Sequence, residues 1–181
     1  MIIETARLRL RPYRESDRDS FAAMNADPEV MRFFPAPKSR TESDQQFDHF
    51  ARHFEEHGYS INACDTLADG SFVGAIGLAR LETDLREALP GRPEVEIGWR
   101  FHKRFWGQGL APEGARAWLD FAWTVLALPE VVAITHVHNL PSRRVMEKIG
   151  MIRDPDGDFD HPGIAEGNPV RPHVLYRISR P

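Results

Sequence analysis

The chain has 181 residues, of which 41% are hydrophobic and 28% are charged, and its formal net charge at pH 7 is −4. This length and apolar content are typical of one globular domain with its own core, and they exclude a disordered or fibrous chain. We therefore expect a single domain over residues 1–181 and, because an acidic chain is poorly suited to bind a polyanion, no nucleic-acid partner.

The first part of the sequence carries one strand signal and two helix signals. Arginine and leucine alternate over residues 7–11, which predicts a strand. Ser16 and Thr41 are expected to be the N-caps of two helices, because a side-chain oxygen at that position accepts a bond from a free backbone N–H. Gly58 is expected to end the second helix.

A hairpin signal comes next, with strands expected at residues 59–63 and 72–81. Residues 81–93 are a polar excursion without apolar periodicity. The later elements are expected to be a strand from Glu94, a helix from Pro112, a strand at 131–137, a helix at 142–149 and a strand at 174–178.

The sequence has no segment suited to a membrane or to export. Its longest uncharged apolar run, Phe72 to Ala79, is far too short to span a bilayer. The N-terminal residues lack the charged, apolar and small-residue succession of a signal peptide. The single cysteine, Cys64, excludes an internal disulfide. We expect a cytoplasmic protein with no membrane partner, either a monomer or a homodimer.

The most informative stretch is EVEIGWRFHKRFWGQGLAPEG, from Glu94 to Gly114. An apolar-alternating strand runs into a basic loop with two glycines, Gly107 and Gly109, and Pro112 then opens a helix. The first N–H groups of a helix lack intrahelical partners and carry the positive end of its dipole. A turn of this kind therefore predicts a phosphate-binding site.

Two familiar phosphate loops do not match. A P-loop needs Lys-Ser or Lys-Thr after its last glycine, and neither Gly107 nor Gly109 is followed by that pair. The dinucleotide fingerprint fits these two glycines, but Pro112 occupies the place of the third. In addition, the next strand, 131–137, ends in histidine instead of an acidic residue.

What remains is the stretch from Arg104 to Ala111, which fits the pattern Gln/Arg-x-x-Gly-x-Gly/Ala. It resembles the acetyl-CoA loop of the GNAT N-acetyltransferase superfamily. A second block, Asn139 to Met151, is similar to the family's strand-end asparagine followed by its last helix. The Glu96-Ile-Gly-Trp strand and the Asn-x-Pro-Ser helix start resemble most the branch containing the ribosomal-protein alanine N-acetyltransferases.

The resemblance implies an α/β (α+β) fold with a central mixed, mostly antiparallel sheet and helices on both faces. The sheet is expected to splay open between the loop-bearing strand and the next one. In the family acetyl-CoA lies in that splay, and its pantetheine arm pairs with strand backbone like an added edge strand. Acetyl-CoA is thus the expected co-substrate. The residues expected to bind it are Trp99, Phe101, Arg104, Phe105, Trp106, Gly107, Gln108, Gly109, Leu110, Ala111, Asn139 and Ser142.

Acetyl transfer to an amine needs a group that removes a proton from the amine. Glu96 is the expected general base, because it lies beside the cofactor loop and corresponds to the glutamate of the family's Glu-Ile-Gly strand. An α-amine titrates near pH 8 and needs little basic help, so a carboxylate acting through water suffices. The alternative is that Glu96 is an ordinary polar residue on the exposed side of a half-buried strand.

The leaving thiolate must also be protonated. Many members of the family use a tyrosine four residues after the position of Ser142, but Met146 stands there in this chain. Ser142 is the nearby hydroxyl, and the alanine-acetylating branch also has a serine at this position, so it is the expected donor. The alternative is that Ser142 only caps its helix. Asn139, expected to bind the pantetheine arm, can itself be an N-cap ahead of Pro141.

The segment from Asp154 to Pro172 is too long and polar for a passive connector. Its spaced aspartates invite a calcium-site interpretation. Counting from Asp154, however, Phe159 and Ala165 stand where an EF-hand loop needs glycine and glutamate. No metal is expected.

We expect this segment to form the acceptor side of the site. Phe159, His161 and His173 are predicted to lie near the acceptor pocket, with Phe33 and Phe34 on the opposite wall. Each histidine also has a purely structural alternative.

These features predict transfer of an acetyl group from acetyl-CoA to a primary amine, a protein N-terminus or a small amine, by direct attack in a ternary complex. Cys64 lies outside both motifs, so no covalent enzyme intermediate is needed. The alternative is a non-catalytic acyl-CoA-binding or regulatory module, which the absent tyrosine favours. A nucleotide-dependent oxidoreductase is a third possibility, disfavoured by Pro112.

Overall fold

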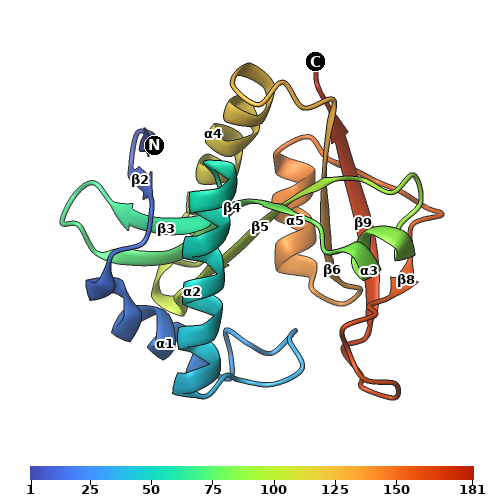
Figure 1. Ribbon diagram of the computed structural model, residues 1–181, viewed down its shortest axis with the longest axis horizontal. Helices are drawn as coiled ribbons and strands as arrows, with labels where there is room; N and C mark the ends of the chain where they lie inside the picture. The colour runs from blue at the N-terminus through green and yellow to red at the C-terminus, as the bar shows by residue number, and fades with distance from the viewer.

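A computed structural model describes all residues, 1–181, as a nine-stranded sheet with helices on both faces (Figure 1). The strand order is β1-β2-β3-β4-β5-β6-β9-β7, with β8 beside β9. The strands are β1 (Ile3–Glu4), β2 (Leu8–Arg11), β3 (Ile61–Thr66), β4 (Phe72–Arg80), β5 (Val95–Phe101), β6 (Glu130–His136), β7 (Ile152–Arg153), β8 (Phe159–Asp160) and β9 (Pro172–Ser179). The helices are α1 (Arg18–Ala26), α2 (Arg40–His57), α3 (Thr83–Ala88), α4 (Leu110–Thr124) and α5 (Leu140–Lys148), with short 3-10 turns η1 (Glu15–Asp17) and η2 (Lys103–Phe105).

The sheet consists of two halves joined at one point. All neighbouring strands are antiparallel except β5 and β6, which are parallel and share a single bridge, Glu96 to Val132. On its other side β5 pairs with β4 along its whole length, from Val95 to Phe101. Beyond the bridge β5 and β6 diverge, so the expected mixed, splayed sheet is confirmed.

Helices cover the two faces of the first half-sheet, because successive strand residues point to opposite sides. Cys64 in β3 and Ile76 in β4 belong to the main core, which includes Trp118 of α4. Their neighbours Ala63 and Ala75 face a second cluster with residues of α1 and α2. In Figure 1, α2 crosses in front of β3, β4 and β5.

Both expected N-caps are wrong by a few residues. Ser16 lies inside the turn η1, ahead of α1. Ser39, not Thr41, caps α2: its side chain accepts from the Glu42 N–H, and the Glu42 carboxylate accepts from the Ser39 N–H. This reciprocal pair satisfies two free groups at once, whereas a cap at Thr41 satisfies fewer. Gly58 ends α2 in a left-handed conformation, as expected.

The polar excursion at residues 81–93 contains the helix α3, which its polar pattern did not predict. Leu81 and Leu89 flank this helix and are buried against Val132 of β6 and Leu175 of β9. The segment therefore ties the first half-sheet to the second on the side away from the diverging strand ends.

A buried ion-pair cluster fixes the first half-sheet. The guanidinium of Arg11 in β2 donates to Asp65 of β3 at 2.5 and 2.8 Å and to Asp17 of η1 at 2.7 and 2.9 Å. The side chains of Arg11 and Asp65 are only 5% and 6% exposed. Two carboxylates thus surround one buried guanidinium with bidentate bonds.

No helix of the protein is both long enough and apolar enough to cross a membrane.

We predict that Asp65→Asn lowers the free energy of unfolding by about 3 kcal/mol, because the asparagine amide accepts only one of the two bonds from Arg11 and leaves a buried N–H of this charged group without an acceptor. The matched control is Glu4→Gln, which breaks the pair with Arg9, where the side chains are 54% and 43% exposed. Exposed pairs contribute less than about 1 kcal/mol. Urea unfolding of both variants measures the difference; equal, small losses would contradict the prediction.

Candidate active site

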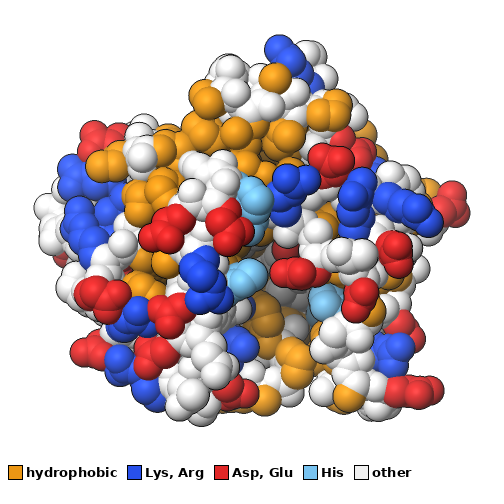
Figure 2. Space-filling view, viewed as in Figure 1, with side chains coloured by type: hydrophobic (Ala, Val, Ile, Leu, Met, Phe, Trp, Pro, Cys, Tyr) orange, Lys and Arg blue, Asp and Glu red, His pale blue; other side chains and the backbone are white.

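A cleft of about 860 Å³ opens where β5 and β6 diverge. Its lining comes from β5, from the loop between η2 and α4, from the α1–α2 connection and from the segment before β9. Figure 2 shows the surface hollowed near the middle of this face, with histidine, acidic and hydrophobic side chains around the hollow. The cleft is large enough for a cofactor and a second substrate together.

The edge of β5 that faces the cleft has free backbone groups. The His102 N–H donates to Val73 O of β4 at 2.9 Å. Because backbone groups alternate in direction along a strand, the N–H groups of Trp99 and Phe101 point the other way, toward the cleft. The side chain of Phe101 is buried in the main core, and the Trp99 side chain packs against that core.

The turn between β5 and α4 has the glycine-dependent shape that the sequence predicts. Gly107 and Gly109 have φ values of 73° and 75°, in the left-handed region that favours glycine. The amides of Gly107, Gln108 and Gly109 donate to no protein acceptor, and Leu110 begins α4. The Trp106 amide differs from the prediction, since it already donates to Lys103 O at 3.0 Å.

Other side chains of this loop stabilise its conformation by hydrogen bonds to the backbone. The Trp106 indole N–H donates to Phe101 O at 2.8 Å, closing the end of β5. Gln108 Nε2 donates to Arg104 O at 2.8 Å. The Arg104 guanidinium is exposed and lies 4.7 Å from the centre of the Phe105 ring.

The N-terminal strands hold the loop in place. Arg7 Nη1 donates to Gln108 O at 2.9 Å, and its Nε donates to Glu113 of α4 at 2.6 Å. The Glu113 carboxylate also accepts from the Thr5 hydroxyl at 2.6 Å. We call these contacts of Thr5 and Arg7 with Gln108 and Glu113 the latch. The sequence did not reveal it, because about a hundred positions separate the residues that it joins and no local pattern marks them.

Glu96 lines the cleft at the single bridge between the two half-sheets. Its side chain is half-buried, on the face of β5 opposite Val95 and Ile97, as predicted. Burial alone raises the pKa of Glu96 from its ordinary value of 4.5 to about 7. Its partial burial in the cleft lining distinguishes Glu96 from an exposed polar strand residue.

The start of α5 separates the roles of Asn139 and Ser142. Asn139 is the N-cap: its Oδ1 accepts from the Ser142 N–H at 3.3 Å, and its Nδ2 donates to Thr135 Oγ1 at 2.9 Å. The alternative that Ser142 caps the helix is therefore wrong. The Ser142 hydroxyl lines the cleft and has no hydrogen-bond partner within the protein. Met146 is buried in the main core.

His136, which was not among the predicted acceptor residues, lies between Phe33 and His173. Phe33 lies 5.7 Å from the His136 ring, His136 lies 6.3 Å from His173, and His173 lies 5.0 Å from His161. These four side chains line the cleft. Burial lowers the pKa of His173 to about 4, so its imidazole is neutral at pH 7.

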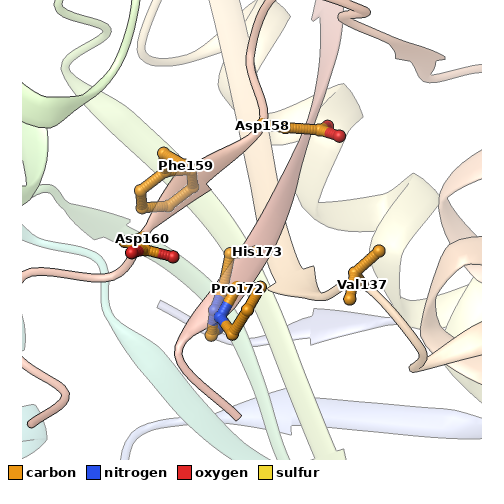
Figure 3. Close-up of a pocket in the computed structure, with 6 residues that line it drawn as sticks. All are labelled: Val137, Asp158, Phe159, Asp160, Pro172 and His173. Atoms are coloured by element: carbon orange, nitrogen blue, oxygen red, sulfur yellow. The ribbon is translucent and has the colours of Figure 1, made fainter. Parts of the chain in front are cut away.

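Phe159 lies outside the main cleft, which corrects its predicted position. It pairs with His173 across β8 and β9 and lines a smaller neighbouring pocket (Figure 3). Its ring is 5.8 Å from that of His173 and therefore supports the cleft wall from behind. The pattern did not reveal this, because β8 is only two residues long.

The aspartates of the same segment face arginines. Asp154 accepts from Arg177 at 2.7 Å, and Asp158 accepts from Arg153 at 2.6 Å. These ion pairs fold the segment onto β9, which explains why it packs as part of the second half-sheet.

Arg100 is a further cleft residue without a predicted role. It lies on the same face of β5 as Glu96, and its Nη1 donates to Asn25 Oδ1 at 2.6 Å and Gln46 Oε1 at 3.0 Å. Phe34 covers the guanidinium at 4.2 Å. The sequence offered one signal for its position: Arg100 lies four residues after Glu96, and strand residues separated by an even number share one face.

Comparisons with known proteins agree with this geometry. The profile of the acetyltransferase (GNAT) domain matches residues 7–152. The chain is 31% identical over 191 residues to the FsC-acetyl coenzyme A-N(2)-transacetylase of Aspergillus fumigatus, covering 98% of this chain and 76% of that protein. It is 34% identical over 88 residues to the putative ribosomal N-acetyltransferase YdaF of Bacillus subtilis, covering 49% of this chain and 44% of that protein.

Solved structures give the same result. An acetyltransferase from Agrobacterium tumefaciens superposes with a TM-score of 0.79 at 26% identity, covering 99% of this chain and 95% of that one. The chain belongs to the GNAT family of acetyl-CoA-dependent N-acetyltransferases.

We predict that Asn139→Ala lowers the free energy of unfolding by about 1 kcal/mol, because it removes the N-cap of α5. Ser142→Ala is the matched control one helical turn away and should change it by less than about 0.5 kcal/mol, since this hydroxyl has no partner. Urea unfolding at constant pH measures both. An equal loss in Ser142→Ala would mean that its hydroxyl does stabilise the helix start.

Proposed function

We propose that the protein transfers the acetyl group of acetyl-CoA to a primary amine by direct attack, with both substrates in the cleft at once. The observation that carries this proposal is the layout of β5: free backbone groups at Trp99 and Phe101, the loop with free amides beyond them, and Glu96 at the closed end. Cys64 is fully buried away from the cleft, which supports direct transfer without a covalent enzyme intermediate.

The residues present fit acetyl-CoA. The free amides from Gly107 to Ala111 point to a pyrophosphate site at the start of α4, where the helix dipole favours negative charge. Arg104 adds an exposed positive charge beside it. The open edge of β5 is suited to pair with the amide groups of the pantetheine arm. The Asn139 oxygen has a second lone pair free for the same arm.

Glu96 is the proposed general base. With a pKa of about 7, a large fraction of this carboxylate is ionised at neutral pH and can take a proton from an amine, directly or through one water molecule. Bound acetyl-CoA supplies the thioester, whose C–S bond breaks as the new C–N bond forms. The proton lost by the amine balances the proton that the sulfur gains.

Ser142 is the proposed proton donor to that sulfur. Its hydroxyl is free in the cleft because Asn139 performs the capping, and buried Met146 offers no competing donor. The Phe101 N–H is proposed to stabilise charge that develops during transfer, as a fixed donor in a partly dry site does.

The acceptor is proposed to enter between the α1–α2 connection and the segment before β9. Phe33, Phe34, His161 and His173 line that part of the cleft, and Phe159 supports it from behind. The relatives are described as an N(2)-transacetylase and a putative ribosomal N-acetyltransferase, which supports an amine acceptor without fixing its size.

The test is release of free CoA thiol from acetyl-CoA with a panel of short peptides, polyamines and aminoglycosides. Turnover with one class supports the transferase and identifies the acceptor type. Intact acetyl-CoA across the panel, with binding retained, would favour the alternative of a non-catalytic acyl-CoA-binding module.

We predict that Glu96→Gln lowers kcat/KM for the acceptor at pH 8 by about 10²-fold or more, and that the ionisation near pH 7 disappears from the pH profile. An unchanged rate and profile would exclude Glu96 as the base.

Stability provides the control for this variant. A carboxyl whose pKa is raised from 4.5 to about 7 on folding stabilises the fold below pH 4.5 and loses that contribution as the pH rises through 7. Glu96→Gln should therefore be more stable than the wild type above pH 7, and the difference should shrink toward pH 4.5. A loss of activity with this stability pattern is not caused by unfolding.

We also predict that Gly107→Ala raises KM for acetyl-CoA by about tenfold, because a left-handed alanine costs about 1–2 kcal/mol and the loop would relax away from its shape. Gly58→Ala is the matched control: it has a φ of 76° and open space around it, and it ends α2 outside the cleft lining. Both variants should lose similar stability, but only Gly107→Ala should bind acetyl-CoA more weakly. Equal KM values would contradict the proposed loop site.

A further inference from the structure

Arg100 and Arg11 are held in two different ways. The guanidinium of Arg11 has two carboxylates, each with bidentate bonds. Arg100 has no carboxylate within ion-pair distance, and its protein acceptors are the neutral amide oxygens of Asn25 and Gln46. The fold thus gives buried Arg11 two carboxylate partners and leaves half-buried Arg100 without a counter-charge.

The neutral partners hold Arg100 in a fixed position. Asn25 of α1 is completely buried, and its Nδ2 donates to Ser43 Oγ of α2 at 2.9 Å. With its Oδ1 committed to Arg100, Asn25 is locked between two helices. Gln46 of α2 approaches the same Nη1 atom, and Phe34 covers the guanidinium plane at 4.2 Å. Arrangements of this kind orient a guanidinium for a ligand.

Part of the guanidinium has no partner. The Nε atom of Arg100 is shielded from bulk solvent and donates to nothing in the protein. Burial lowers the pKa of Arg100 to about 10, with a small opposing effect from the buried Tyr13. The group therefore stays charged at pH 7. An unpaired charge in such a place costs several kcal/mol unless an anion arrives.

The other acids of the cleft do not supply that anion. The pKa of Glu96 is raised by burial alone, with no contribution from Arg100. Glu29, at the cleft mouth, pairs with Lys103. Glu82 also lines the cleft but makes no ion pair with Arg100.

We propose that Arg100 binds a carboxylate on the acceptor, so that the acceptor is an amine that also carries a carboxylate several bonds away. A single guanidinium flanked by neutral amides matches one negative charge, which favours a carboxylate over a phosphate dianion, and its fork fits a carboxylate in a bidentate manner. The inference rests on the proposed function, because it assumes that the amine lies near Glu96.

The spacing along β5 sets the length of the acceptor. Glu96 and Arg100 are four residues apart on one face, so their Cα atoms are about 13 Å apart at about 3.4 Å per residue. Strand side chains stand roughly perpendicular to the sheet, and Asn25 and Gln46 hold Arg100 so that it cannot lean toward Glu96; a free α-amino acid is therefore too short for that span. A short peptide with a free C-terminus, or an ω-amino acid, has the required reach.

The test measures binding separately from catalysis. Ala-Ala-Ala and its C-terminal amide, and 6-aminohexanoate and hexylamine, form two pairs that differ in the carboxylate. Calorimetric titration into protein saturated with CoA should give at least tenfold tighter binding of the acid in one pair. In Arg100→Gln that preference should disappear. Turnover with acetyl-CoA should follow the same preference in kcat/KM.

Two further variants keep the proposal falsifiable. Arg32→Gln removes an exposed cleft arginine, stacked on Phe33, and should leave the preference for the acid intact. Arg100→Lys keeps the charge without the fork and should retain part of the preference. Because Arg100→Gln removes the donor to the buried Asn25 Oδ1, it should lose some stability, and binding is therefore compared at a temperature at which both proteins are folded.

The outcomes separate the two proposals. Equal binding of acid and amide in both pairs, with acetyl-CoA consumed by other amines, would overturn the role of Arg100 and leave the transferase proposal standing. A carboxylate preference in binding without any turnover would support the Arg100 site and contradict the transferase proposal. A preference that persists in Arg100→Gln would overturn the assignment to this residue.

Discussion

The site exists because very few backbone hydrogen bonds join the two half-sheets. β5 and β6 share one parallel bridge, Glu96 to Val132, and then diverge, while each strand is fully paired on its other side. The unpaired edge of β5 cannot be satisfied by the protein, so its N–H groups remain available to a ligand with amides of its own. The same divergence separates the cofactor loop from α5 and makes room for the cleft.

Two ionisable residues around this opening are withdrawn from water without an oppositely charged partner. Glu96 is half-buried without a partner, and Arg100 is held by amides instead of carboxylates. Both cost stability in the absence of ligands. Arg11, by contrast, is buried with two carboxylates in the interior of the first half-sheet. The fold therefore pairs its buried structural arginine with carboxylates and leaves without counter-charges the two ionisable groups that face the cleft, as functional sites commonly do.

Most features that depend on neighbouring residues were predicted correctly from the sequence, whereas features that depend on residues far apart in the chain were not. The strand 95–101, the glycine loop and α4 were correct because alternation, left-handed glycines and a helix start are local signals. The caps at Ser16 and Thr41 were wrong because neighbouring residues compete for the same role. The surroundings of Arg100 were not predictable, since Asn25 and Gln46 lie 75 and 54 positions away. The exact place of Phe159 depended on the pairing of a two-residue strand.

The contacts of Arg7 with Gln108 and Glu113 bear on how the proposed cofactor site can be inherited and engineered. The glycine loop reads as a self-contained motif, yet its backbone is fastened to the first strands, about a hundred residues earlier. A chimaera that receives the loop and its helix without those strands would contain the sequence motif, but nothing would hold the loop in its conformation. The motif is therefore a property of the assembled domain, and its two ends must be exchanged together.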